Sequence, residues 1–431
     1  LEERADQRDN LLCLSITNQR ETFVVFDKVT GQPLYRAIVW QCRRGEPRCR
    51  HLVEAGHEAQ VAALTGLKID TYFPAAKIAW LLDAEPAIRA RLEEGTALLG
   101  TIETYLIYRL TGGAVFASDH TNACRTLLYD IHALNWNDDL CALFGVPRRA
   151  LAEIRESAAQ FGQTDCGGLL PAPIPICGVM GDSQAALFAQ RCYQPGGAKV
   201  TFGTGSSVLL NVGTHPVRSM RGIVTTVGWV YGGQPTYAFE GIINFTGATI
   251  AWMRDQLELI RDSKETGALA ASVLDNGGVY LVPAFVGLSA PYWRADVQAA
   301  ILGLTPSSTR AHVVRAALES IAYQVRDVLG LMAEDAGITL QSVQADGGAV
   351  ANAFLMQFTA DLTRLRLRAS GLPELSALGA VFSGLLGMGV YGSLADLEAL
   401  PADFSDYAPT MSAEHAEQLY AGWQAAVRRI L

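Results

Sequence analysis

Short apolar runs that end in glycine-containing turns recur along this 431-residue chain, and this pattern restricts the fold that the chain can adopt. Each run has the length and composition of a buried β-strand, and a helical pattern follows two of the three turns. Strands that alternate with helices in this way are typical of an α/β fold. The three runs, each with its turn, are 174–180 with Gly181-Asp182, 198–203 with Gly203-Thr204-Gly205-Ser206, and 342–345 with Asp346-Gly347-Gly348.

Other segments extend the same alternation. The clearest helix covers 312–336, where apolar side chains recur every three or four residues and Gly337 follows as a C-cap. A long, mostly helical region is expected to end at about Arg155. Further strands are expected at 11–17, 22–27, 37–40, 223–230, 237–239 and 279–282, and further helices at 183–190, 247–257 and 350–362.

Length and composition indicate two domains and narrow the class of protein. The chain is too long for one ordinary core, so we expect domains at 1–190 and 196–431, with Pro195-Gly196-Gly197 between them. A hydrophobic content of 50% excludes a disordered chain, and no apolar run approaches the ~20 residues of a membrane span. A net charge of −9 argues against a nucleic-acid partner. The eight cysteines have no CxxC spacing, which favours reduced thiols and a cytoplasmic protein.

Asp182 is a candidate general base because it lies where a strand passes into a helix. Functional sites of α/β folds concentrate at such carboxyl ends of strands, and a carboxylate there can accept a proton from a substrate hydroxyl. Aspartate is also favoured as a helix N-cap, and the residue alone does not separate the two interpretations.

The glycine turns at 203–207 and 346–352 are candidate phosphate sites. Backbone N–H groups in such turns converge on an anion, and two glycines let a ligand approach the chain closely. The alternatives are an ordinary hairpin at 203–207 and a tight connection in which Asp346 caps the following helix. Neither turn has the spacing of a Walker loop or of the GxGxxG fingerprint.

Four residues in the first 72 could hold a polyol. Arg20 and Glu21 are adjacent at a strand end, where they can donate to and accept from neighbouring hydroxyls. Trp40 offers an apolar face for a carbon chain, and Tyr72 offers a hydroxyl. The alternatives are a surface ion pair for the first two and core packing for the two aromatic side chains.

Seven motifs occur together in one order along the chain. They are 18–22 (NQRET), 37–44 (AIVWQCRR), 181–188 (GDSQAALF), 203–205 (GTG), 284–293 (AFVGLSAPYW), 318–324 (LESIAYQ) and 346–352 (DGGAVAN). In these motifs the sequence resembles the FGGY carbohydrate kinase family, closest to its glycerol kinase branch. The resemblance runs from about Leu11 to nearly the C-terminus.

The resemblance implies two actin/hexokinase-like (ribonuclease H-like) domains with a cleft between them. ATP would bind mainly to the second domain and the polyol mainly to the first. The implied reaction converts glycerol and ATP into glycerol 3-phosphate and ADP, with Mg²⁺. The resemblance also implies a homodimer or homotetramer.

Individual residues match the family's site residues. Asp182 matches the general base and a polyol contact, and Ser183 stands at a further polyol position. The other residues at polyol positions are Arg20, Glu21, Trp40 and Tyr72, and those at nucleotide positions are Thr204, Gly205, Gly247, Gly348, Ala349 and Asn352.

Several positions depart from the family pattern. Glycerol kinases usually have glutamine at Ser183 and phenylalanine at Ser207, so the polyol pocket here is expected to be roomier and more polar. The alternative substrate is therefore a longer polyol or sugar such as erythritol or xylulose. Ala251 replaces a glutamine near the nucleotide, and 167–171 lacks the basic loop that binds a sugar bisphosphate regulator in bacterial glycerol kinases.

The largest departure concerns the start of the chain. Family members begin with strands that carry an Asp-x-Gly-Thr-Thr/Ser loop, whose aspartate organises Mg²⁺, and nothing in 1–10 matches it. We therefore expect an N-terminally truncated fragment, in which the first domain lacks its N-terminal strands and the Mg²⁺ ligand lies outside the sequence. The alternative is a non-catalytic remnant that binds a polyol or a nucleotide.

Overall fold

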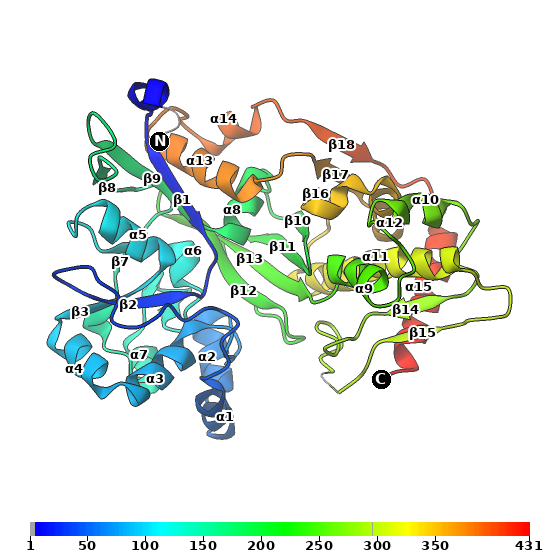
Figure 1. Ribbon diagram of the computed structural model, residues 1–431, viewed down its shortest axis with the longest axis horizontal. Helices are drawn as coiled ribbons and strands as arrows, with labels where there is room; N and C mark the ends of the chain where they lie inside the picture. The colour runs from blue at the N-terminus through cyan, green and yellow to red at the C-terminus, as the bar shows by residue number, and fades with distance from the viewer. Residues whose placement is uncertain (1–4, 295) are drawn as a thin grey trace.

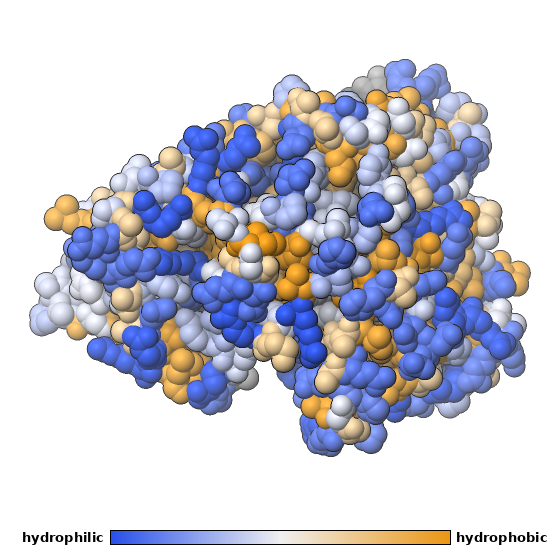
Figure 2. Space-filling view, turned by 180° about the vertical axis from the view of Figure 1, so that it is seen from behind, coloured by the Kyte–Doolittle hydropathy of each residue, from blue (hydrophilic) through white to orange (hydrophobic). Residues whose placement is uncertain are grey.

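The computed structural model describes residues 5–294 and 296–431, so the expectation about 1–10 falls partly outside the described residues. Two α/β lobes lie side by side, as expected, and strands at one edge of the second lobe's sheet lie between them (Figure 1). The surface is indented where the lobes meet (Figure 2). Across both described ranges, no helix has the length and apolar character needed to cross a membrane.

The first domain is built around strand β9, which ends at the candidate base. β1 pairs with β9 in parallel, β8 pairs with its other edge in antiparallel fashion, and further strand pairs surround this sheet. The strands are β1 (Leu14–Asn18), β2 (Phe23–Asp27), β3 (Ala97–Thr101), β4 (Ala117–Asp119), β5 (Tyr129–Asp130), β6 (Asn135–Trp136), β7 (Glu153–Arg155), β8 (Gln160–Thr164) and β9 (Ile174–Gly181). The helices are η1 (Ala5–Asn10), α1 (Glu46–Glu54), α2 (Glu58–Thr65), α3 (Pro74–Ala84), α4 (Pro86–Glu94), α5 (Ile102–Leu110), α6 (His120–Ala123), α7 (Asp138–Phe144), η2 (Arg148–Ala150) and α8 (Asp182–Ala189).

The second domain is a seven-stranded sheet in the order β12-β13-β11-β10-β16-β17-β18, with a separate β14-β15 pair. Its strands are β10 (Gly197–Phe202), β11 (Ser206–Gly213), β12 (Val224–Tyr231), β13 (Gln234–Ile243), β14 (Tyr280–Val282), β15 (Ala300–Leu302), β16 (Ser342–Asp346), β17 (Arg366–Ser370) and β18 (Phe404–Tyr407). Its helices are α9 (Gly247–Asp255), α10 (Glu265–Ala271), α11 (Arg310–Ala336), η3 (Gly348–Ala351), α12 (Ala353–Thr363), α13 (Leu375–Gly387), α14 (Leu394–Glu398) and α15 (Ala413–Arg428).

Local sequence explains the ends of α11, the longest of these helices. Thr309 and His312 form a reciprocal capping box at its start, which satisfies N–H groups that have no partner inside the helix. Gly337 follows the last turn with a φ of 64°, a left-handed conformation that glycine adopts without strain. Between these ends, the apolar stripe of α11 packs into the core of the second domain.

One expectation about the first domain is wrong, and another is incomplete. Residues 37–40 do not form a strand, because only Ile38 makes an isolated bridge to Phe23. The region before Arg155 is mostly helical, as expected, but the short strands β3 to β7 lie within it. A short apolar run such as 97–101 fits a strand or a buried helix equally well, so periodicity alone does not separate them.

Helix α13 joins the two lobes, because it lies between β17 and β18 of the second domain's sheet in the chain but packs on α8, β9 and β1 (Figure 1). Glycines make this approach possible. A Cβ atom on Gly379 would lie 1.9 Å from the carbonyl oxygen of Ala185, and one on Gly178 would lie 2.2 Å from that of Ala380. α13 therefore packs closely against both β9 and α8, the strand that ends before Asp182 and the helix that begins at it.

Candidate functional site

The turn between β1 and β2 carries Arg20 and Glu21. Both side chains are buried, with 5% and 2% exposure, so the alternative of a surface ion pair is wrong. Glu21 has a φ of 61°, which is uncommon for a residue with a Cβ atom and is a form of strain found at functional sites. The turn thus holds a strained acidic residue beside an arginine at the end of a buried strand.

Arg125 and Glu240 complete a buried cluster of four charges with this pair. Arg20 Nη2 donates to Glu240 Oε1 at 2.6 Å, and Arg125 Nη2 lies 2.6 Å from Glu240 Oε2. Arg125 Nε also donates to Glu21 Oε1 at 2.7 Å. Burial alone would raise the pKa of Glu240, but Arg125 and Arg20 together lower it to about 2. The sequence analysis missed both Arg125 and Glu240, since neither belongs to a recognisable motif.

Asp182 lies at the start of α8, beside this cluster. Its side chain is 43% exposed, and Oδ1 lies 3.1 Å from Arg20 Nε and accepts the N–H of Ser183 at 2.7 Å. Gly181 occupies the N-cap position and makes no side-chain cap hydrogen bond, so Asp182 is not the N-cap of α8. The structure therefore brings Asp182 and Ser183 together with Arg20 and Glu21, and leaves the carboxylate accessible.

Trp40 and Tyr72 form an aromatic pair near these charges. Their ring centroids are 5.6 Å apart with planes at 61°, and Trp40 is 37% exposed. Burial raises the pKa of the Tyr72 hydroxyl, and Glu21 raises it further, so this hydroxyl remains a neutral hydrogen-bonding group. Lys77, which the sequence analysis also missed, lies fully buried behind this pair.

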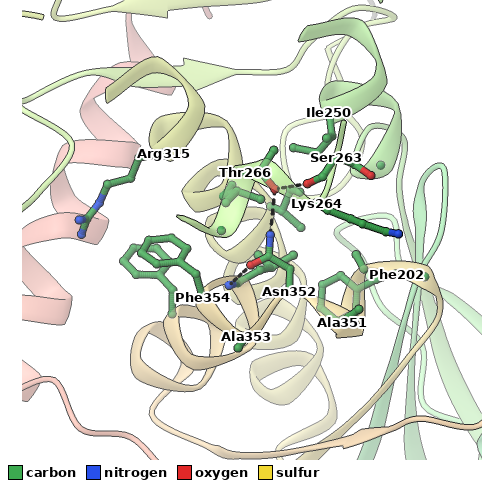
Figure 3. Close-up of a pocket in the computed structure, with 18 of the residues that line it drawn as sticks. Phe202, Ile250, Ser263, Lys264, Thr266, Arg315, Ala351, Asn352, Ala353 and Phe354 are labelled. Carbon is green, nitrogen blue, oxygen red and sulfur yellow. Dashed lines mark hydrogen bonds between the residues drawn. The ribbon is translucent and has the colours of Figure 1, made fainter. Parts of the chain in front are cut away.

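A large cavity in the second domain contains most of the expected nucleotide residues. It has a volume of about 1140 Å³ and lies between β10, α9, α10 and the turn after β16 (Figure 3). Its walls combine apolar side chains with backbone of two glycine turns, as expected for a small-molecule site. Five expected residues line it: Thr204, Gly247, Gly348, Ala349 and Asn352.

Gly205 is expected at the nucleotide site but does not line the cavity. A Cβ atom at this position would lie 2.5 Å from the carbonyl oxygen of Ile243, so Gly205 allows the β10–β11 turn to pack against β13. The expected hairpin is present, with Phe202 paired to Ser206. Gly205 therefore shapes the turn, while Gly203 and Thr204 of the same turn line the cavity.

Asn352 fixes one wall of the cavity. Its Oδ1 accepts the N–H of Leu355 at 3.1 Å, and its Nδ2 donates to Thr266 Oγ1 at 3.0 Å (Figure 3). Asn352 is thus the N-cap of α12, and the alternative that Asp346 caps this helix is wrong. The side chains of Ser263, Lys264, Thr266, Arg315 and Phe354 also line the cavity and were not anticipated.

The described residues contain no group of three or more His, Cys, Asp or Glu side chains placed to hold a metal ion. Two single carboxylates are nevertheless notable. Asp182 is accessible, and Asp346 Oδ1 is buried without a hydrogen-bond partner beside Gly347. Burial lowers the pKa of Lys199, and the charges of Asp182 and Asp346 partly oppose this shift. The two carboxylates therefore both lie close enough to the Lys199 ammonium to interact with it electrostatically.

Comparison with family models covers most of the chain. Residues 4–189 match the N-terminal domain of the FGGY family of carbohydrate kinases, and residues 198–388 match its C-terminal domain. The chain is 47% identical to a glycerol kinase of Stenotrophomonas maltophilia (strain K279a), over 100% of the chain and 86% of that protein. It is 48% identical to a glycerol kinase of Shewanella baltica (strain OS195), over 98% of the chain and 85% of that protein.

Solved structures agree with these matches. The glycerol kinase of Plasmodium falciparum with ADP has a TM-score of 0.93 and 36% identity, over 98% of this chain and 84% of that one. A xylulose kinase from Rhodospirillum rubrum has a TM-score of 0.85 at 24% identity, over 96% and 83% respectively, and this likeness supports the fold alone.

Proposed function

The chain belongs to the FGGY family of carbohydrate kinases, and on that premise we propose that it transfers the γ-phosphoryl group of ATP to glycerol. The products would be glycerol 3-phosphate and ADP. The observation that carries the proposal is an accessible Asp182 beside the buried Arg20–Glu21 pair, in a chain whose second domain holds a large cavity lined by two glycine turns.

The first domain would bind and orient the polyol. Glu21 can accept hydrogen bonds from hydroxyls, while Tyr72 can donate and accept. Arg20 would donate to a hydroxyl oxygen, and Trp40 would cover the carbon chain. Buried, pre-oriented groups of this kind reduce the entropic cost of aligning a hydroxyl with the phosphoryl group.

Asp182 would accept the proton of the attacking hydroxyl. Its carboxylate is accessible and is fixed by Arg20 Nε at 3.1 Å, so it can be oriented without being covered. Thr204, Gly247, Gly348, Ala349 and Asn352 would hold the nucleotide, with the backbone of the glycine turns facing the phosphates. Phosphoryl transfer depends mainly on such positioning and on charge stabilisation, so no covalent intermediate on the protein is needed.

We further propose Mg²⁺ as the metal that accompanies ATP. Asp346 fits it because its carboxylate offers hard oxygen donors, and its Oδ1 has no hydrogen-bond partner within the described residues. When bound, Mg²⁺ neutralises charge that develops on the phosphoryl oxygens.

The free thiols of all eight cysteines are consistent with a reducing, cytoplasmic location. A homo-oligomer stays a prediction.

A coupled assay of ADP release tests the proposed reaction. With ATP and Mg²⁺, we expect ADP release that depends on glycerol, together with stoichiometric glycerol 3-phosphate detected by phosphorus NMR. The absence of ADP release with every polyol offered would contradict the proposal and would favour a non-catalytic protein that binds a polyol or a nucleotide.

A longer polyol or sugar, such as erythritol or xylulose, is the second candidate substrate. Ser183 and Ser207 favour it, because small hydroxyl side chains stand where larger ones usually close the pocket, and Ser207 Oγ is buried without a hydrogen-bond partner among the described residues. The same assay with glycerol, erythritol, xylitol and xylulose compares kcat/KM directly. A higher value for a four- or five-carbon substrate would replace glycerol as the proposed substrate.

A further inference from the structure

The backbone of Glu240 lies in the second domain, but its carboxylate contacts the first domain. It lies within β13, in the sheet of the second domain. Its carboxylate nevertheless pairs with two arginines of the first domain, at 2.6 Å from Arg20 Nη2 and 2.6 Å from Arg125 Nη2. The ion pairs therefore cross the boundary between the domains at the proposed polyol site.

The four charges of this cluster depend on one another. Arg20, Glu21, Arg125 and Glu240 are each no more than 5% exposed, and together they carry two positive and two negative charges. A buried charge without its partner is strongly unfavourable, so the loss of one member would force the others to move or to recruit water. The arrangement is neutral only when Glu240 is present and ionised.

Glu240 also fixes the direction in which Arg20 points. A guanidinium is a rigid planar fork, so two contacts determine its orientation. Nη2 of Arg20 donates to Glu240, and Nη1 donates to Gln184 Oε1 at 3.0 Å. With both of these nitrogens held, Nε is the side that faces Asp182 at 3.1 Å.

We propose that Glu240 is a positioning residue for polyol binding, acting from the second domain through Arg20 and, through Arg125, on Glu21. This inference rests on the proposed function of the same site. Glu240 touches neither the polyol nor the nucleotide in this scheme. Arg125 Nε, 2.7 Å from Glu21 Oε1, extends the same support to the second polyol-binding carboxylate.

The test separates binding of the two substrates. Glu240→Gln keeps the shape of the side chain and removes its charge, so Arg20 loses its main anchor. We expect the KM for glycerol to rise by ~10-fold or more, the order of loss that follows a small misplacement of a binding group. The KM for ATP and the affinity for ADP should stay within about twofold, because the nucleotide cavity does not include Glu240.

Matched variants distinguish positioning from general destabilisation. Asp327 is a buried carboxylate of α11 that accepts the Nε1–H of Trp423 at 2.8 Å, away from both binding sites, so Asp327→Asn should leave the KM for glycerol unchanged whatever it does to the melting temperature. Glu240→Asp retains the charge and should give a KM closer to that of the wild type. In a double-mutant cycle, Arg125→Met should add little to the effect of Glu240→Gln on the glycerol KM. Both substitutions remove the same ion pair, so the second has little left to disrupt.

The outcomes are separable. A glycerol KM within twofold of the wild type in Glu240→Gln, or an equal rise in the KM of both substrates, would overturn the positioning role and leave the proposed function standing. A wild-type protein without polyol-dependent ADP release would instead overturn the proposed function, and this inference with it.

Discussion

Lys77 Nζ donates to the main-chain carbonyl oxygen of Tyr72 at 3.0 Å. The same ammonium donates to the carbonyl oxygens of Val39 and Trp40, each at 3.3 Å. One buried side chain of α3 thus ties together the two separate segments that present Trp40 and Tyr72. Because these three carbonyl groups take up the three N–H donors of the ammonium, Lys77 acts as a fixed connector at the back of the proposed polyol site.

Lys77→Met should loosen this aromatic pair. The side chain keeps most of its volume, but three carbonyl groups lose a donor, and a buried polar group without a partner costs about 1–3 kcal/mol. We expect a lower free energy of unfolding in urea and a glycerol KM that rises more than the KM for ATP. Lys28→Met, at an exposed lysine, is the control and should change neither quantity. An unchanged glycerol KM in a destabilised Lys77→Met variant would show that Lys77 serves the fold alone.

The same lysine predicts a pH dependence of stability. Burial lowers the pKa of Lys77 to about 8 from the ordinary lysine value of 10.5, although Glu21 opposes the shift. Between these two values the unfolded chain binds a proton that the folded chain does not, so the free energy of unfolding rises with pH in this window. Its total change is at most about 3 kcal/mol. Below pH 8 this contribution is constant.

Urea denaturation of the wild type and of Lys77→Met, from pH 7 to 10.5, measures this contribution as the difference between the two proteins. We expect the wild type to gain stability relative to the variant as the pH rises above 8. A difference that stays flat across this range would mean that Lys77 titrates at its ordinary pKa.

Asp182→Asn should remove turnover while leaving nucleotide binding intact. The amide cannot accept the hydroxyl proton, and the loss of a general base lowers kcat by about 10²–10⁴-fold. ADP affinity, measured by calorimetry, should stay within about twofold because the cavity is lined by other residues. Asp165→Asn, at an exposed loop position, is the matched control. If more than a tenth of the wild-type kcat survives in Asp182→Asn, the carboxylate is not the base.

Local sequence was sufficient for features that are made within a few residues. The strand-to-helix transition at Asp182 and the turns after β10 and β16 follow from apolar runs beside glycine, and the structure contains each of them. Residues 37–40 were wrongly expected to be a strand because β propensity describes fit to a half-buried surface and says nothing of an available partner strand. Local sequence thus predicts where helices and strands end and where they turn, but it does not predict which strands pair with each other.

The charged partners of the site could not be found this way. Arg20 and Glu240 are 220 residues apart in sequence, and Arg125 and Glu21 are 104 apart, so only the packed fold brings them together. A lone glutamate within an apolar strand such as β13 is nevertheless a usable signal. An acidic side chain at a buried strand position requires a cation, and Arg20 was already a candidate site residue.

Gly347→Ala should impair the nucleotide site selectively. Gly347 has a φ of 92°, and a Cβ atom there would lie 2.4 Å from the carbonyl oxygen of Phe202, so alanine must displace the turn that leads into η3. Gly348 and Ala349 follow directly and line the cavity, so we expect the KM for ATP to rise by ~10-fold or more, as for a misplaced binding group. Gly371→Ala is the control, because its Cβ atom would meet nothing within 4 Å. Glycerol affinity without nucleotide, measured by calorimetry, should be unchanged in both variants. An ATP KM in Gly347→Ala equal to that of the control would mean that the turn does not contact the nucleotide.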